Sequence, residues 1–157
     1  MDDLRNRLKA VVETAPTLTL EGFESFYVMM KSRGGGKRIL TRKQYQETLT
    51  SKRRELFYAP LDRLSRAVEW LGSQPRRKTI NRRVGSSYRL KHVFQHQTGI
   101  FIENGLFIAA ALIAGLTFES FDDSRNAYLN LASKMNTRIP AAGWAGEEEP
   151  LTEQHDG

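Results

Sequence analysis

The feature that most constrains the fold is an apolar run of 14 residues at positions 105–118, with the sequence GLFIAAALIAGLTF. A helix that crosses a bilayer needs about 20 apolar residues, so this run is too short for that role. Glu103 and Asn104 also lie directly before it. We therefore expect a helix buried in a globular core, capped by Asn104, continuing to about Ala114 and stopped by Gly115.

Length and composition favour one globular domain without a membrane segment. The chain has 157 residues, of which 39% are hydrophobic and 27% are charged, and this length is sufficient to bury a core. It contains no cysteine, which excludes disulfide bonds and thiolate metal sites. The N-terminus lacks the apolar stretch of a signal peptide, so we expect a cytoplasmic protein.

Apolar periodicity predicts an all-α fold, with a single compact domain of about seven helices and little or no sheet. In residues 3–14 the apolar side chains recur at helical spacing (Leu4, Leu8, Val11 and Val12). Further helices are expected at about residues 20–32, 42–58, 60–71, 87–97, 104–114 and 122–135. The intervening residues 74–85 lack a helical stripe and are expected to form a loop or a two-stranded wing.

Capping signals support several of these boundaries. Thr41 can cap the third helix, and Pro60 suits the first turn of the fourth. Either Ser86 or Ser87 can cap the fifth helix, and Gly99 ends it.

The second and seventh helices are predicted from weaker signals. Thr19 can cap the second, which is expected to bury four side chains, namely Phe23, Phe26, Tyr27 and Met30. Asp122 and Asp123 favour the start of the seventh, because carboxylates are stabilised at the positive end of the helix dipole.

The net charge of +6 is unevenly distributed. Residues 139–157 carry five acids and no Lys or Arg, which leaves +11 for residues 1–138. Prolines and glycines interrupt this acidic segment, so we expect a disordered tail after a helical domain at 1–138. Such a tail can solubilise the protein or screen its basic surface from weak partners.

The strongest functional signal is a basic segment at positions 76–91, in a stretch without carboxylates between Glu69 and Glu103. Cations without a local counter-ion repel one another, so such a segment favours an external polyanion such as nucleic acid. Its seven cations are Arg76, Arg77, Lys78, Arg82, Arg83, Arg89 and Lys91. An acidic protein partner and a merely solvated basic loop remain alternatives.

Two further groups of residues support phosphate binding. Ser86, Ser87 and Tyr88 lie at an expected helix start, where backbone N–H groups and hydroxyls commonly hold phosphates. Around the triple glycine at 34–36 lies a second basic cluster, formed by Lys31, Arg33, Lys37, Arg38, Arg42 and Lys43. The triple glycine followed by lysine does not complete a P-loop, because the required first Gly and the following Ser or Thr are missing.

Sequence-specific base recognition and catalysis are not indicated. The order of helices in 88–114 would allow a helix-turn-helix, but its second helix offers almost no polar side chain to base edges. His92 and His96 share a helix face and could supply two metal ligands, although surface histidines explain the spacing better. Their protonation below about pH 6.5 would add positive charge. Carboxylates are absent near the basic segment, so we expect no enzyme activity and no cofactor or metal.

Part of the chain is similar to a known group of proteins. Residues 79–116 contain the pattern SYRLKH followed by NGLFIAAAL, carried by Ser87, Tyr88, Leu90, Lys91, His92, Asn104, Gly105, Phe107, Ile108, Ala109, Ala110 and Ala111. This pattern resembles a motif of small, mostly uncharacterised proteins of bacterial plasmids, phages and integrative elements, and it covers about a quarter of the chain. The resemblance implies a mobile-element context, makes Tyr88, Lys91 and His92 functional candidates, and makes Asn104 and Gly105 a structural turn.

These observations together predict a non-catalytic nucleic-acid-binding protein, on DNA or RNA, that contacts mainly the phosphate backbone. The expected binding residues are Arg76, Arg77, Lys78, Arg82, Arg83, Ser86, Ser87, Tyr88, Arg89, Lys91, Lys37, Arg38 and Arg42. The competing interpretation is an inhibitor or adaptor whose basic face docks on an acidic protein. The small residues of the apolar helix suit either a core or the seam of a homodimer.

Overall fold

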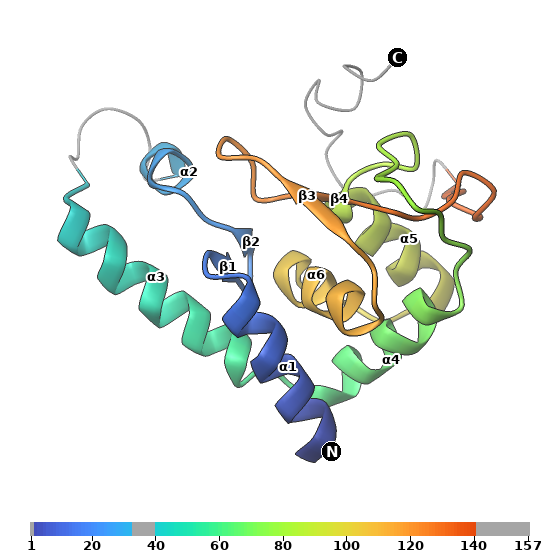
Figure 1. Cartoon of the computed structure of the whole chain (residues 1–157), viewed down its shortest axis with the longest axis horizontal. Helices are drawn as coiled ribbons and strands as arrows, with labels where there is room; N and C mark the ends of the chain where they lie inside the picture. Colours follow the sequence, from blue (N-terminus) through green and yellow to red (C-terminus); the bar gives the residue numbers. More distant parts are fainter. Residues whose placement is uncertain (1, 33–39, 141–157) are drawn as a thin grey trace.

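The computed structural model describes residues 2–32 and 40–140. In these ranges the chain forms six helices and two antiparallel hairpins of two strands each (Figure 1). The helices are α1 (Asp2–Thr14), α2 (Phe26–Ser32), α3 (Arg42–Phe57), α4 (Leu61–Gly72), α5 (Ser87–Thr98) and α6 (Asn104–Ile113). The strands are β1 (Leu18–Thr19), β2 (Gly22–Phe23), β3 (Phe118–Ser120) and β4 (Ala127–Leu129).

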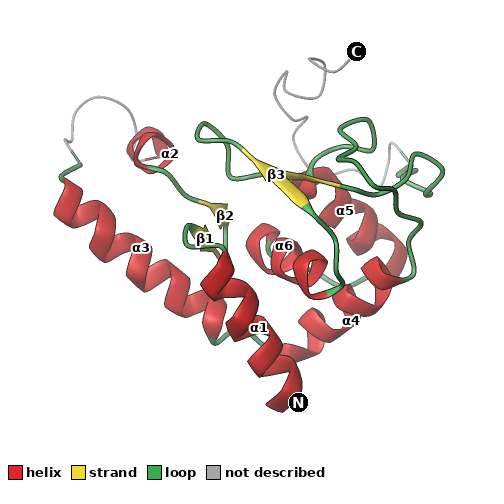
Figure 2. Cartoon of the chain, viewed as in Figure 1, coloured by secondary structure: helices red, strands yellow, loops and turns green. Residues whose placement is uncertain are grey.

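The fold is therefore mostly helical, but it is not the all-α fold of seven helices that periodicity predicts. Figure 2 shows the short strands against the predominantly helical remainder. The predicted acidic tail falls mainly on residues 141–157, which lie outside the described residues, as do Lys37 and Arg38.

Helix α6 is the centre of the core, as its apolar sequence predicts. Residues 106–111 are fully buried, and α6 packs against α1, α4 and α5 (Figure 1). The ring of Phe107 lies 6.1 Å from that of Phe94 and 6.3 Å from that of Trp70. The alanines of α6 allow neighbouring elements to approach closely, which gives the dense packing of a protein interior.

The predicted helix boundaries are confirmed where capping signals are strong. Thr41 caps α3 through a reciprocal pair of hydrogen bonds with Gln44. Gly99 follows α5 in the left-handed conformation, with φ of 75°. The start of α6 differs slightly, because Glu103 is the N-cap residue and the side chain of Asn104 turns toward the hairpin β1–β2.

The predicted second helix is wrong over its first half. Residues 18–23 form the hairpin β1–β2, in which Leu18 pairs with Phe23. Gly22 has φ of +124°, a conformation incompatible with a helix. A Cβ at this position would also lie 2.3 Å from the carbonyl oxygen of Arg125, so the hairpin passes directly against a distant segment.

The shortened helix α2 also exposes a different face from the one that periodicity predicts. It buries Val28 and Met29. In contrast, Phe26, Tyr27 and Met30 are 41%, 57% and 39% exposed. Phe23, in β2, is buried as predicted, but the prediction was wrong for Phe26, Tyr27 and Met30.

The predicted seventh helix is a β-hairpin instead. Strands β3 and β4 pair in antiparallel register, with Phe118 opposite Leu129 and Ser120 opposite Ala127. Asp122 and Asp123 lie in the connecting turn rather than at a helix start. Strand β4 is buried throughout, and its second edge is covered by the loop that follows α4. Those partners are distant in sequence, so periodicity alone could not reveal the strand.

Candidate nucleic-acid interface

The basic loop, residues 76–83, is held in place by backbone pairing with the end of β4. The amide of Arg77 donates to the carbonyl of Asn130 at 2.9 Å, and the amide of Asn81 donates to Leu129 at 2.9 Å. The side chain of Asn130 donates in return to the carbonyl of Arg77 at 2.8 Å. The predicted loop is thus confirmed, and it is anchored to the sheet at both of its ends.

Asn81 is the buried anchor of this loop, with an exposed fraction of 1%. Its Nδ2 donates to the carbonyl of Leu131 at 2.9 Å and to Oγ of Ser133 at 3.0 Å. Its Oδ1 accepts a hydrogen bond from the amide of Arg83 at 3.1 Å. Because both ends of the amide are bound, the backbone carrying Arg82 and Arg83 has a defined position.

The basic loop brings three arginines to one open surface pocket of about 470 Å³. We call it the arginine pocket, and its lining residues are Arg77, Thr79, Ile80, Asn81, Arg82, Arg83 and Glu119. Three guanidinium groups and one carboxylate leave it a formal charge of +2. Such a concave, positively charged surface concentrates anions.

Glu119, from β3, corrects the expectation that the basic segment has no counter-ion. Its Oε1 lies 2.7 Å from Nη2 of Arg82, and the Arg82 guanidinium also lies 4.9 Å from the ring centroid of Phe121. The sequence pattern did not reveal Glu119, because the hairpin brings it to Arg82 from 37 positions away. Its only sequence signal is that it is the sole carboxylate between Glu103 and Asp122.

The other cations of the segment point in different directions. Arg76 donates to the carbonyl of Ala114 at 3.0 Å, at the C-terminal end of α6, where the helix dipole favours a positive charge. Lys78 and Arg83 are exposed and form no ion pair with the described residues. Arg89 donates to the carbonyl of Thr137 at 3.3 Å. The structure therefore gathers only part of the predicted set around the arginine pocket.

Lys91 is buried rather than displayed, with an exposed fraction of 8%. Its Nζ lies 5.5 Å from the ring centroid of Tyr88 and 5.4 Å from that of Phe101. Burial lowers the pKa of Lys91, and the negative charge of Glu103 partly opposes that effect. Its ammonium group therefore lies beside the rings of Tyr88 and Phe101 on a largely buried side chain.

The Ser87 hydroxyl, at the start of α5, binds other parts of the fold. Ser86 and Ser87 are 1% and 0% exposed. Ser87 Oγ donates to Oδ1 of Asn104 at 2.8 Å and accepts from the amide of Ala127 at 3.0 Å. Tyr88 is half-buried, with its ring edge-on to His92 at 4.7 Å. The predicted anion pocket at this helix start is therefore closed by the chain itself.

Of the two histidines, His92 differs from the sequence expectation. Burial and the positive charges of Lys91 and Arg89 lower the pKa of His92 to about 4, so it does not gain charge near pH 6.5. His96 is exposed. Within residues 2–32 and 40–140, no group of three His, Cys, Asp or Glu side chains could hold a metal ion.

The second basic cluster is described only in part. Arg42 is exposed at the first position of α3, followed by the exposed Lys43, and Lys31 is exposed in the last turn of α2. Lys37 and Arg38 lie outside the described residues. The contacts between the described residues do not join this cluster to the arginine pocket.

Comparisons of the chain with protein-family models, with curated proteins and with solved structures found no match. Within the described ranges, none of the helices is long and apolar enough to cross a membrane.

Proposed function

We propose that this protein is a non-catalytic nucleic-acid-binding protein that holds phosphates at the basic loop. The observation that supports this proposal is that Arg77, Arg82 and Arg83 line one open pocket, which contains a single carboxylate. Guanidinium groups bind phosphate oxygens through paired, charge-assisted hydrogen bonds, and the planar fork of arginine suits this geometry. Arg76 and Lys78 lie in the same loop and add to its positive field.

Phosphate contact explains the site better than base recognition. The arginine pocket lies on a loop supported by a sheet, and none of its lining residues belongs to a helix. Contacts to phosphates position a protein on nucleic acid without reading its sequence. We therefore propose binding with little sequence preference. The motif resemblance supports a bacterial mobile element, and thus the cytoplasm, as the setting.

The test is a salt titration of binding to random duplex and single-stranded DNA. The substitutions Arg77→Ala and Arg83→Ala, made together, should weaken binding to all sequences about equally. Each lost phosphate contact lowers the slope of log K against log salt by about 0.9 on duplex DNA, so the double variant should lose about 1.8. Arg54→Ala with Arg66→Ala is the matched control, because it removes the same charge from exposed positions on α3 and α4.

The outcome also distinguishes a nucleic-acid-binding protein from one that docks on an acidic protein. Wild-type affinity for random DNA that hardly changes between low and moderate salt would contradict phosphate binding and favour docking on an acidic protein. Equal losses in the pocket variant and the control variant would show that only net charge matters. Arg83→Ala alone guards against misfolding, because the side chain of Arg83 makes no hydrogen bond or ion pair with the described residues.

A further inference from the structure

Two of the three arginines in the arginine pocket are fixed before any ligand arrives. Arg77 folds back on its own loop, where Nε donates to the carbonyl of Thr79 at 3.0 Å and Nη2 donates to that of Ile80 at 2.7 Å. Arg82 is held by Glu119 and by the ring of Phe121. Binding of an anion therefore costs less side-chain entropy here than at freely rotating surface arginines.

The geometry and charge of the pocket suit one compact, multiply charged group. Arg77, Arg82 and Arg83 all line a single space of about 470 Å³. An internal phosphodiester carries one negative charge and two non-bridging oxygens. A terminal phosphomonoester carries a charge of about −1.5 to −2 and three acceptor oxygens. This charge matches the formal +2 of the pocket, and the three oxygens can use donors from three arginines.

We infer that the arginine pocket binds a terminal phosphomonoester of a nucleic-acid chain, so that the protein recognises phosphorylated ends in preference to internal backbone. This inference rests on the proposed function and specifies its ligand. In this arrangement Arg77 and Arg82 contact two sides of the phosphate. The exposed Arg83 supplies the remaining donors. Lys78 lies in the same loop but does not line the pocket, so it serves the general attraction to the backbone.

The experiment compares oligonucleotides of one sequence that differ only at their ends. Three single strands of equal length carry a 5′-phosphate, a 3′-phosphate or hydroxyls at both ends, and each is also tested as a duplex. Binding is measured by anisotropy of an internal fluorophore at fixed salt. We expect one phosphorylated end to bind about ten-fold more tightly than the hydroxyl end, as additional charge-assisted hydrogen bonds would produce. The two phosphorylated arms show which end is recognised.

The variants assign this preference to the pocket. Arg83→Ala should remove most of the difference between phosphorylated and hydroxyl ends, and Arg77→Ala should do the same. Lys78→Ala, the matched control, should weaken binding to all oligonucleotides while keeping their ratio. Circular dichroism shows whether each variant is folded.

Three results would overturn the inference in different ways. Equal affinity of wild type for all ends, with a normal salt slope, would end the inference and leave phosphate-backbone binding intact. Absence of binding to every oligonucleotide would remove the proposed function together with it. An end preference that survives both arginine substitutions would place the phosphate elsewhere on the protein.

Discussion

Ser87 Oγ donates a hydrogen bond of 2.8 Å to Oδ1 of Asn104, which joins the first turn of α5 to the first turn of α6 across 17 positions. Nδ2 of the same asparagine donates to the carbonyl of Glu21 at 3.2 Å and to Oδ1 of Asn126 at 3.0 Å. The Ser87 hydroxyl also accepts from the amide of Ala127. This buried pair therefore ties both hairpins to the helical core, which gives two residues of the SYRLKH–NGLFIAAAL pattern a structural role.

Replacing Ser87 with alanine should lower the free energy of unfolding by about 1–3 kcal/mol. The substitution leaves the amide of Ala127 and the oxygen of Asn104 without their partner in a fully buried place. Urea denaturation measures the change. Ser65→Ala, at an exposed position of α4, is the control and should stay within about 0.5 kcal/mol of wild type. Equal stability of all three proteins would contradict the role given to Ser87.

Replacing Gly105 with alanine should destabilise the protein by about 3 kcal/mol or more, since overpacking cannot be relieved against backbone. A Cβ at Gly105 would lie 1.7 Å from the carbonyl oxygen of Thr19 and 2.7 Å from the carbonyl carbon of Leu20. The hairpin β1–β2 would have to move away from α6. Gly72→Ala is the matched control, because a Cβ there meets no atom within 4 Å, and helix propensity should make it neutral or stabilising. Thermal denaturation should show a lowered Tm for Gly105→Ala and no lowering for Gly72→Ala if this packing is correct.

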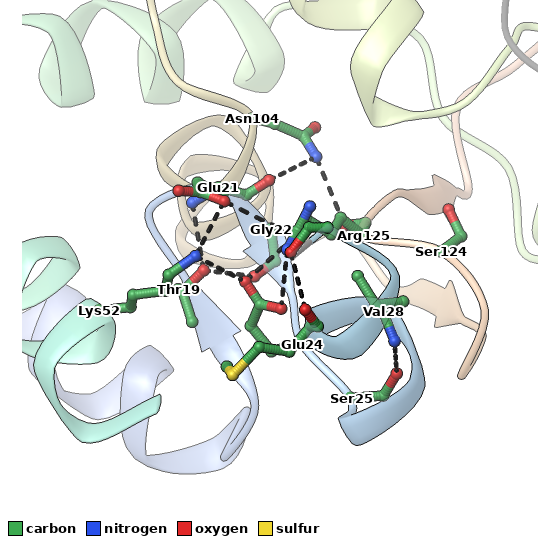
Figure 3. A network of polar contacts seen from close by, with 12 residues as sticks. Thr19, Glu21, Gly22, Glu24, Ser25, Val28, Lys52, Asn104, Ser124 and Arg125 are labelled. Carbon is green, nitrogen blue, oxygen red and sulfur yellow. Dashed lines mark hydrogen bonds and ion pairs between the residues drawn. The ribbon is translucent and has the colours of Figure 1, made fainter. Parts of the chain in front are cut away.

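Replacing Glu24 with glutamine should destabilise the fold by about 3 kcal/mol, because it removes the fully buried carboxylate that pairs with Arg125 and Lys52. The Glu24 side chain is fully buried and accepts from Arg125 at 3.1 and 3.2 Å, and Nζ of Lys52 lies 3.4 Å away (Figure 3). Glu21→Gln removes a carboxylate that is 56% exposed from the same network, so it should cost less than about 1 kcal/mol. Chemical denaturation should show a larger loss of stability for Glu24→Gln than for Glu21→Gln. Equal losses would show that burial does not decide how much each carboxylate contributes to stability.

Lowering the pH from 6.5 toward 4 should reduce stability through His92. Its pKa in the folded protein is lowered to about 4 from 6.5, mainly by burial and then by Lys91 and Arg89. Within this window the unfolded chain binds the proton and the folded one does not, so stability is complete above 6.5 and falls as the pH drops. NMR titration should give His92 a pKa well below 6.5, near 4. A normal pKa for His92, or an unchanged pH dependence in His92→Gln, would contradict this assignment.

Replacing Glu119 with glutamine should strengthen binding to nucleic acid several-fold at low salt. The substitution raises the formal charge of the arginine pocket from +2 to +3 and releases Arg82 from its ion pair. One further phosphate contact would steepen the salt slope by about 0.9 on duplex DNA. Asp62→Asn, an exposed change on α4, alters net charge equally and should have a much smaller effect. Weaker binding by Glu119→Gln would mean that the ion pair is needed to present Arg82.

Local sequence signals were sufficient to predict most of the helices. The stripe of α1, the capping box at Thr41 and the left-handed Gly99 each act within one or two helical turns, so their effects can be read from neighbouring residues. The apolar run of α6 predicted its burial for the same reason. The hairpins were missed because strands of two or three residues depend on partners far along the chain.

The candidate site was predicted in composition but not in arrangement. The charge pattern identified the basic loop, yet it could not distinguish the exposed Arg83 from the buried Lys91. It also treated Ser87 as a phosphate ligand, whereas the fold uses its hydroxyl internally. Glu119 entered the site only through strand pairing.

The amino-acid sequence by itself determined the helical core and the excess of positive charge before it, because periodicity, capping and charge are properties of adjacent residues. Only the tertiary structure decided which cations face solvent, which carboxylate meets them and where one pocket forms. Those outcomes depend on backbone pairing between the basic loop and β4 and between β3 and β4, and such pairing joins segments whose proximity no local pattern encodes.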